Sequence, residues 1–233
     1  MRADGLRWIG AAEMAAPRFD AAMAVAGVFD LRDPALAGLP TLPPTASDIL
    51  DEGRPLAGRR DHFRARRALT RHLLARWLGR APENVVVAHD AAGAPRVLAP
   101  DNGAFVSVAA RGPIAAIAVA ATPIGIDIEP VETPREPVWT VLHRDERAAI
   151  EGAWRDGDDA PFRDTWIAKE AWLKALGAGL RRDPAGVLIR RDGKSGFTIV
   201  DNSDPRQLAL GALRTVAMGD ATIRCAVAIL AAP

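Results

Sequence analysis

Two carboxylate side chains on one face of a predicted strand are the residues of this chain best suited to chemistry. The segment from Gly125 to Glu129 reads Gly-Ile-Asp-Ile-Glu, and side chains two apart in a strand point to the same face. Asp127 and Glu129 should therefore lie side by side. They belong to an apolar run that begins at Ile114, which is typical of buried strands, and a buried carboxylate is costly unless it is paired or binds a metal. Taken alone, an Asp-x-Glu strand is more often a solvated outer face.

A predicted helix carries the groups that complete this chemistry. The segment from Trp166 to Lys174 reads Trp-Ile-Ala-Lys-Glu-Ala-Trp-Leu-Lys, and it places Glu170 and Lys174, four apart, on one face with Trp166. Taken alone, such a Glu/Lys pair is usually a surface pair. If helix and strand pack together, three carboxylates and an ammonium converge, and oxygen ligands of this kind suit a Mg²⁺ ion that also holds substrate phosphates. The predicted metal ligands are Asp127, Glu129 and Glu170.

Lys169 belongs to the same helix but not to the same face. It lies about 100° around the helix from Glu170, since successive residues advance by that angle. We therefore expect Lys169 to be structural or a peripheral phosphate contact.

The elements that must position these groups follow from hydrophobic periodicity and turn residues. The pattern predicts strands at 6–9, 85–88, 104–109, 114–120, 124–128, 187–189, 197–200, 207–212 and 222–230, the third and fourth forming a hairpin. It predicts helices at 59–78, with Gly79 as a C-cap, and at 143–153 and 161–176. Residues 19–29 fit a strand or a helix, residues 33–58 read as a proline-rich loop, and residues 90–95 read as a turn.

The helix predicted from Arg59 carries a stripe of arginines opposite its apolar side. At 100° per residue the stripe falls within about 60°, with Leu69, Leu73 and Trp77 on the far side. The stripe consists of Arg60, Arg64, Arg67 and Arg71. A solvated basic face is one interpretation. The other is a cradle for phosphates, because guanidinium groups bind phosphate oxygens bidentately.

Composition limits the function classes further. The chain has 233 residues, a net charge of +1 and 49% hydrophobic residues, so it can bury a substantial core and does not suit a general polyanion binder. Its one cysteine, Cys225, excludes a disulfide framework and is expected in a buried strand. No stretch has membrane-spanning or signal-peptide character, which predicts a cytoplasmic protein without membrane partners. The four histidines lack metal-ligand spacing.

The two motifs together resemble a known family. Gly-Ile-Asp-Ile-Glu, then Trp-x-x-Lys-Glu-Ala-x-x-Lys about forty residues on, then Gly177-x-Gly179-Leu180, is similar to the signature of the 4′-phosphopantetheinyl transferases of the surfactin-synthetase-activating type. A weaker similarity extends from about Arg59 to the last strand. The resemblance implies an α+β fold built as a pseudo-twofold pair of similar subdomains, here 1–121 and 122–233, the second carrying the metal motifs.

The resemblance also implies the reaction and the roles of its residues. Phosphopantetheine would pass from coenzyme A to a serine of an apo acyl or peptidyl carrier protein, with Mg²⁺ on the pyrophosphate. Glu170 would act, directly or through a water, as the base for that serine, and Lys174 would stabilise charge on the phosphate under attack. A similar Ala-Arg-x-x-Leu-Arg pattern makes Arg67 the leading contact to coenzyme A, with Arg60 and Arg64 beside it. A monomer is expected.

Two positions depart from the family pattern. Where the family has Gly-Lys-Pro the chain has Gly93-Ala94-Pro95, and where the family has a histidine the chain has Ala110, within Ser107 to Arg111. Arginines stand beside both gaps, which makes Arg96 and Arg111 candidates for the 3′-phosphate of coenzyme A.

Two other functions remain as alternatives. The altered segment at Ala109-Ala110-Arg111 favours a non-catalytic or diverged relative that binds carrier protein or nucleotide, although such a module would not need metal ligands. The arginine stripe would also suit a nucleic-acid-binding module. The chain is nearly neutral and lacks tyrosine, however, so no nucleic-acid partner is expected.

Overall fold

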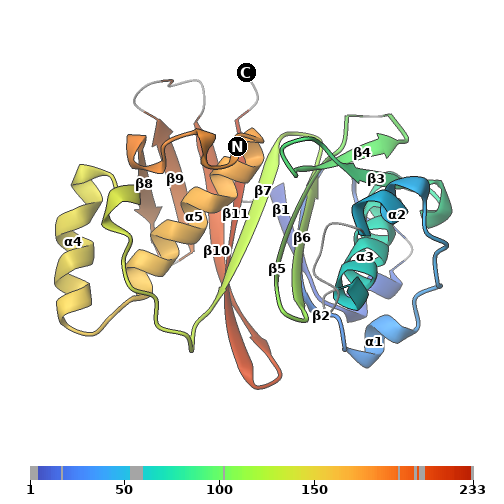
Figure 1. Cartoon of the computed structure of the whole chain (residues 1–233), viewed down its shortest axis with the longest axis horizontal. Coiled ribbons are helices and arrows are strands. Elements are labelled where there is room, and N and C mark those ends of the chain that lie inside the picture. Colours follow the sequence, from blue (N-terminus) through green and yellow to red (C-terminus); the bar gives the residue numbers. More distant parts are fainter. Residues whose placement is uncertain are drawn as a thin grey trace. The chain divides into compact units, whose positions relative to one another are not determined.

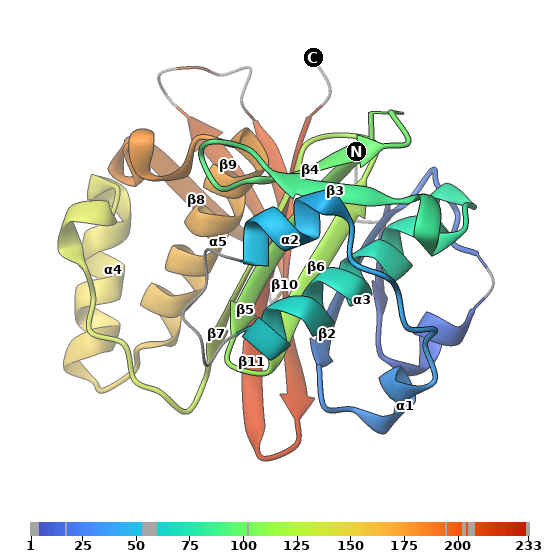
Figure 2. The same ribbon diagram turned by 45° about the vertical axis from the view of Figure 1, so that its right-hand side comes forward.

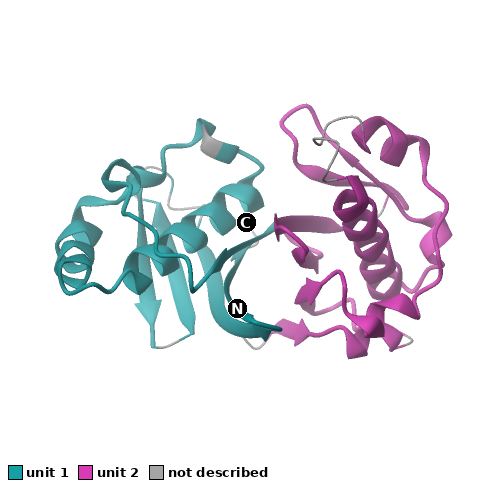
Figure 3. Cartoon of the chain, turned by 60° about the horizontal axis from the view of Figure 1, so that its bottom comes forward, with its two compact units in different colours: residues 1–4, 123–233 teal, residues 5–122 magenta. Residues whose placement is uncertain are grey.

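The chain folds into an α+β structure, as predicted (Figure 1). The computed structural model describes residues 5–16, 18–52, 60–101, 103–193, 195–201, 204 and 208–231. Two compact units divide the chain, an N-terminal unit of residues 5–122 and a C-terminal unit built on residues 123–233, coloured separately in Figure 3. The domain boundary predicted after residue 121 lies next to this division. That the two halves are separate domains stays a prediction.

A four-stranded sheet forms the centre of the N-terminal unit. Its order is β1-β2-β6-β5, with β1 parallel to β2 and the other neighbours antiparallel. The predicted hairpin is confirmed as β5 and β6, which turn at Gly112 with a φ of +57°. The segment at 19–29 that fitted either element contains a strand, β2. The bounds are β1 Leu6–Ile9, β2 Ala24–Asp30, β5 Phe105–Arg111 and β6 Ile114–Ala120.

Helix α3 (Arg60–Leu78) covers this sheet with its apolar side. Its C-cap is Gly79, as predicted, in the left-handed conformation with a φ of +63°. The predicted first residue, Arg59, lies outside the described residues. The buried cluster under the helix joins Leu69, Leu73 and Trp77 to Val25, Phe29, Ile117 and Val119.

Two short helices and a small hairpin flank α3 (Figure 2). They are α1 (Pro34–Ala37), α2 (Ala46–Glu52), β3 (Val86–His89) and β4 (Pro95–Ala99), with α2 packed against β3 and α3. The predicted turn between the strands is confirmed, and Gly93 provides its positive φ of +85°. The sequence pattern did not predict β4, because proline at its first residue reads as the end of a turn.

The prediction that residues 33–58 form a loop was wrong for two stretches. Pro34 occupies the first turn of α1, where its missing N–H costs nothing, and the side chain of Asp33 accepts a hydrogen bond from the N–H of Ala35. Helix α2 contains no proline, and buried ion pairs to α3 hold it in place. Residues 53–58 lie outside the described residues.

The C-terminal unit contains a five-stranded antiparallel sheet. Its order is β7-β11-β10-β9-β8. All five strands were predicted, but β8 continues three residues and β10 six residues further than predicted, and Gln207, the predicted start of β10, lies outside the described residues. Cys225 lies buried in β11, as expected, and burial raises the pKa of its thiol. The bounds are β7 Ile124–Pro130, β8 Val187–Asp192, β9 Gly196–Asp201, β10 Ala209–Met218 and β11 Ala221–Leu230.

Helix α5 (Ala160–Leu176) lies against this sheet in Figure 1 and makes most of the contact with it. Its buried side includes Ile167, Ala171 and Trp172, and Gly177 ends it with a φ of +64°. Helix α4 (Arg144–Arg155) starts with a capping box between His143 and Glu146 and packs on α5. Short 3₁₀ turns occur at Ala12–Ala15, Pro82–Asn84, Trp139–Val141, Gly179–Arg181 and Pro184–Gly186. Within the described residues, every helix is too short or too polar to cross a membrane.

Candidate functional site

Gly125 brings strand β7 and helix α5 into backbone contact. A Cβ atom on Gly125 would lie 1.8 Å from the carbonyl oxygen of Ala171 and 2.6 Å from the nitrogen of Ala175, so only glycine fits here. This contact fixes which face of β7 looks toward α5. Because alternate residues share a face, Asp127 and Glu129 lie on that same side.

Asp127 pairs with Lys174 across this contact. One carboxylate oxygen, Oδ1, accepts a hydrogen bond from Lys174 Nζ at 2.7 Å, and Nζ also donates to the carbonyl of Ile126 at 3.1 Å. The other oxygen, Oδ2, is buried and has no hydrogen-bond partner among the described residues. A buried oxygen that lacks a donor loses its hydration without compensation. Asp127 therefore has capacity for one more cation or donor.

Glu129 pairs with an arginine that the sequence patterns did not single out. Arg135 Nη1 contacts Glu129 Oε1 in an ion pair, and the guanidinium lies over the ring of Trp166, 4.8 Å from its centroid. The backbone N–H of Arg135 donates to Asp159 Oδ2 at 2.9 Å. Arg135 stands in the proline-rich connection after β7, where no periodicity marks a side chain as inward-facing.

Glu170 lies on α5 between the two groups just described. It is half-buried and lies one turn from both Trp166 and Lys174. Trp166 contacts Arg135, the partner of Glu129, and Lys174 is itself the partner of Asp127. The predicted convergence of the strand and helix motifs is thus supported by one direct ion pair and one contact through Arg135.

The three carboxylates do not form a ready metal site. Among the described residues, no group of three His, Cys, Asp or Glu side chains is gathered closely enough to hold a metal ion. The donors still fit Mg²⁺, because they are carboxylate oxygens and Asp127 Oδ2 lacks a partner. Two protein cations occupy Asp127 and Glu129 instead. Ligation by Asp127, Glu129 and Glu170 therefore stays a prediction.

Lys169 is structural, one of the two roles expected for it. Its side chain is fully buried, and Nζ contacts Glu146 Oε2 at 2.7 Å and donates to the carbonyls of Val141, Pro184 and Val187 at 2.9 to 3.0 Å. Glu146 also accepts hydrogen bonds from the N–H groups of His143 and Ile189. Burial lowers the pKa of Lys169, while Glu146 opposes that shift. The pair ties α4, α5 and β8 together.

The arginine stripe of α3 is only partly a surface feature. Arg67 and Arg71 are buried, which contradicts the interpretation of the stripe as a solvated basic face for these two residues, whereas Arg60 and Arg64 are exposed. Arg67 donates to Asp51 Oδ2 and to the carbonyl of Val87, each at 2.6 Å, and its Nε lies 3.4 Å from Asp48 Oδ1.

Helix α2 supplies the acids that cover the stripe. Arg71 lies 3.3 Å from Asp48 Oδ2 and donates to the carbonyls of Pro43 and Val85. Asp48 and Asp51 are three apart in sequence and Arg67 and Arg71 are four apart, so each pair lies on one face of its helix. This complementary spacing is the signal that could have revealed the contact between α2 and α3.

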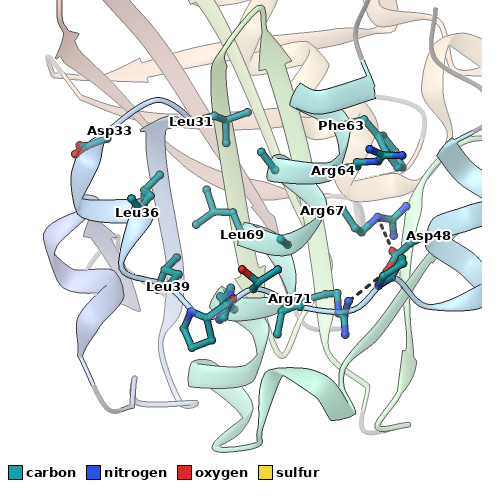
Figure 4. Close-up of a pocket in the computed structure, with 18 of the residues that line it drawn as sticks. Leu31, Asp33, Leu36, Leu39, Asp48, Phe63, Arg64, Arg67, Leu69 and Arg71 are labelled. Carbon is teal, nitrogen blue, oxygen red and sulfur yellow. Dashed lines mark hydrogen bonds and ion pairs between the residues drawn. The ribbon is translucent and has the colours of Figure 1, made fainter. Parts of the chain in front are cut away.

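A cavity of about 600 Å³ opens beside the stripe within the N-terminal unit (Figure 4). Leucines on α1 and on the segments that flank it form one wall, among them Leu31, Leu36 and Leu39. The opposite wall carries Phe63, Arg64, Arg67, Asp48 and Arg71. Arg64 is 64% exposed and pairs with Glu52 at 2.5 Å.

The two substitute arginines occupy different settings. Arg96 in β4 donates to Asp90 Oδ2 at 3.0 Å, beside the turn that contains Ala94. Arg111, at the end of β5, is exposed and donates to the carbonyl of Ala110 at 3.1 Å. The assigned contacts of Arg60, Arg64, Arg67, Arg96 and Arg111 with coenzyme A stay predictions, and the internal hydrogen bonds of Arg67 weigh against that residue.

Comparison with known families places a match on the unit that holds the carboxylates. Residues 123–227 match the family model described as the 4′-phosphopantetheinyl transferase superfamily. The match covers most of the C-terminal unit, includes both β7 and α5, and supports a transferase of this kind. No curated protein matches the chain.

Proposed function

We propose that this protein transfers 4′-phosphopantetheine from coenzyme A to a serine of an apo acyl or peptidyl carrier protein in a Mg²⁺-dependent reaction. The observation that carries the proposal is Asp127, a buried carboxylate with one oxygen on Lys174 and the other without a hydrogen-bond partner. It lies in the segment that matches the transferase superfamily. The surfactin-synthetase-activating subtype, the cytoplasmic location, the monomeric state and the lack of nucleic-acid or membrane partners stay predictions.

Each reacting group has a role that its setting supports. The serine oxygen forms a bond to the phosphorus that carries pantetheine, and the bond from that phosphorus to the bridging oxygen breaks, which releases adenosine 3′,5′-bisphosphate. Glu170 is half-buried and can accept the serine proton, directly or through a water. Lys174 is partly exposed and can move from Asp127 toward the phosphate under attack. Mg²⁺ held by Asp127, Glu129 and Glu170 would neutralise charge on the pyrophosphate.

The proposal is tested by weighing carrier proteins after reaction. Purified protein, coenzyme A and Mg²⁺ are mixed with a panel of apo-carrier proteins from fatty-acid, polyketide and peptide synthesis. We expect one or more carriers to gain the mass of phosphopantetheine, and chelation of Mg²⁺ to stop the gain. A carrier whose target serine is replaced by alanine is the control. If no carrier gains mass while one of them still binds, the diverged binding protein becomes the better interpretation.

A further inference from the structure

Arg135 is the cation of the carboxylate site that neither sequence motif contains. Its guanidinium contacts two groups of this site at once, the Oε1 atom of Glu129 and the ring of Trp166. Its backbone is anchored separately, through the hydrogen bond from its N–H to Asp159. The side chain can therefore change partners while its main chain stays fixed.

The guanidinium of Arg135 is more exposed than the carboxylate of Glu129, so it is the member of this ion pair that can move. The side chain of Arg135 is 33% exposed, whereas that of Glu129 is 10% exposed. A partly hydrated cation can turn away at low cost, but a buried carboxylate depends on a nearby cation for compensation. The cation–π contact with Trp166 also stabilises the guanidinium and does not depend on a carboxylate.

A metal ion on Glu129 would compete directly with Arg135. Both would use the same carboxylate, and a divalent ion beside a guanidinium is repelled by it. The arginine can then leave Glu129 but remain close, because its backbone is fixed and the ring of Trp166 holds its planar face. A guanidinium released in this way presents its donors to phosphate oxygens, which it binds bidentately.

We propose that Arg135 is a phosphate-binding residue whose resting partner is Glu129, and that divalent metal binding releases it. The inference rests on the proposed metal site, where Glu129 is paired with Arg135 and Asp127 with Lys174. The ligand class is a pyrophosphate-bearing molecule, of which inorganic pyrophosphate is the simplest probe.

The test measures two affinities that should change in opposite directions. Mn²⁺ is titrated calorimetrically into the metal-free protein without nucleotide, and inorganic pyrophosphate is titrated at saturating Mn²⁺. In Arg135→Ala we expect Mn²⁺ to bind about tenfold more tightly, since its competitor is gone, and pyrophosphate about tenfold more weakly. Arg135→Lys keeps the charge but not the bidentate geometry, so both of its affinities should lie between those of the wild type and those of Arg135→Ala.

Arg155→Ala is the matched control. Arg155 also pairs with a carboxylate, Glu151, on an exposed surface of the same unit. The affinities of Arg155→Ala for Mn²⁺ and for pyrophosphate should equal those of the wild type. Quenching of tryptophan fluorescence on adding Mn²⁺, compared with Trp166→Phe, reports separately whether the surroundings of Trp166 change.

The outcomes separate this inference from the proposed function. Unchanged or weaker Mn²⁺ binding in Arg135→Ala would overturn the release of Arg135 by metal, and a parallel loss of both affinities would indicate a structural role. Carrier modification by the wild type is measured independently. If carriers are modified but the two affinities do not diverge, only the role of Arg135 fails. If the affinities diverge but no carrier gains mass, the proposed reaction fails and the metal-controlled arginine stands.

Discussion

Both units of this protein pair arginine or lysine with buried carboxylates, but the cations are buried to different degrees in the two units. In the N-terminal unit, Arg67 and Asp51 are 6% and 5% exposed, and both partners belong to the interior. In the C-terminal unit the acids are equally buried, but Lys174 is 30% exposed. A pair with two buried members holds elements together. A pair with one buried acid and one accessible cation can exchange that cation, which is what a binding site requires.

The same contrast occurs within α5. Lys169 and Lys174 belong to one motif, but Lys169 is enclosed by Glu146 and three carbonyls, while the side chain of Lys174 is partly exposed and pairs with Asp127. The type of residue therefore does not decide its role. Its role depends on how exposed the cation is and on whether the second oxygen of the paired carboxylate has a hydrogen-bond partner.

The largest effect should come from breaking the doubly buried pair. Arg67→Ala leaves Asp48 and Asp51 without their shared guanidinium, and we expect the N-terminal unit to lose about 3–5 kcal/mol of unfolding free energy. Urea denaturation measures the change. Arg64→Ala, one turn earlier on α3, removes a pair whose arginine is exposed and should cost far less, because solvent screens such a pair. Equal losses would show that burial does not distinguish the two arginines.

Asp127→Asn should affect catalysis instead of stability. The amide keeps the shape of the side chain but removes the charge that faces Lys174, and we expect turnover of carrier protein to fall about a hundred- to a thousandfold. The melting temperature should change little. Turnover close to that of the wild type at limiting Mg²⁺ would contradict the assignment of Asp127 to the metal.

Arg111 tests whether an exposed cation of the N-terminal unit also binds the donor. Arg111→Ala should weaken the use of coenzyme A about tenfold and leave the use of 3′-dephospho-coenzyme A unchanged, since the donors differ only in that phosphate. Steady-state kinetics with both donors provide the comparison. If the wild type treats both donors alike, the 3′-phosphate is not recognised.

The smallest effect should be a pH dependence of the N-terminal unit. Burial lowers the pKa of His72 below its ordinary value of 6.5, and Nε2 lies 2.8 Å from the carbonyl of Pro40, which can only accept. Between pH 6.5 and that lowered pKa the unfolded chain binds a proton that the folded chain does not. Stability should therefore fall as the pH drops through this range, because the unfolded chain gains the proton first. His72→Gln should flatten the dependence in denaturation curves, and an unchanged slope would exclude His72 as its source.

The sequence predicted regular elements and the two motifs well because both depend on local spacing. Strand β7 and helix α5 follow from the alternation at Asp127 and Glu129 and from the helical spacing of Glu170 and Lys174. The partners of these residues come from irregular segments. Arg135 lies in a connection between elements, and Asp48 and Asp51 lie in a helix that neighbouring prolines concealed. Such contacts depend on tertiary packing, which single-chain periodicity does not encode.

The backbone contact at Gly125 has a consequence for how mutations at this position would be interpreted. The obstacle to a side chain there is the main chain of Ala171 and Ala175, which cannot rotate aside as a side chain can. Even a methyl group would push α5 away from β7 and carry Glu170 and Lys174 together away from Asp127. In a saturation library, position 125 would therefore be as intolerant as a reacting residue, and alanine would be nearly as damaging as leucine. Its intolerance would record a distance between two backbones and no chemical role.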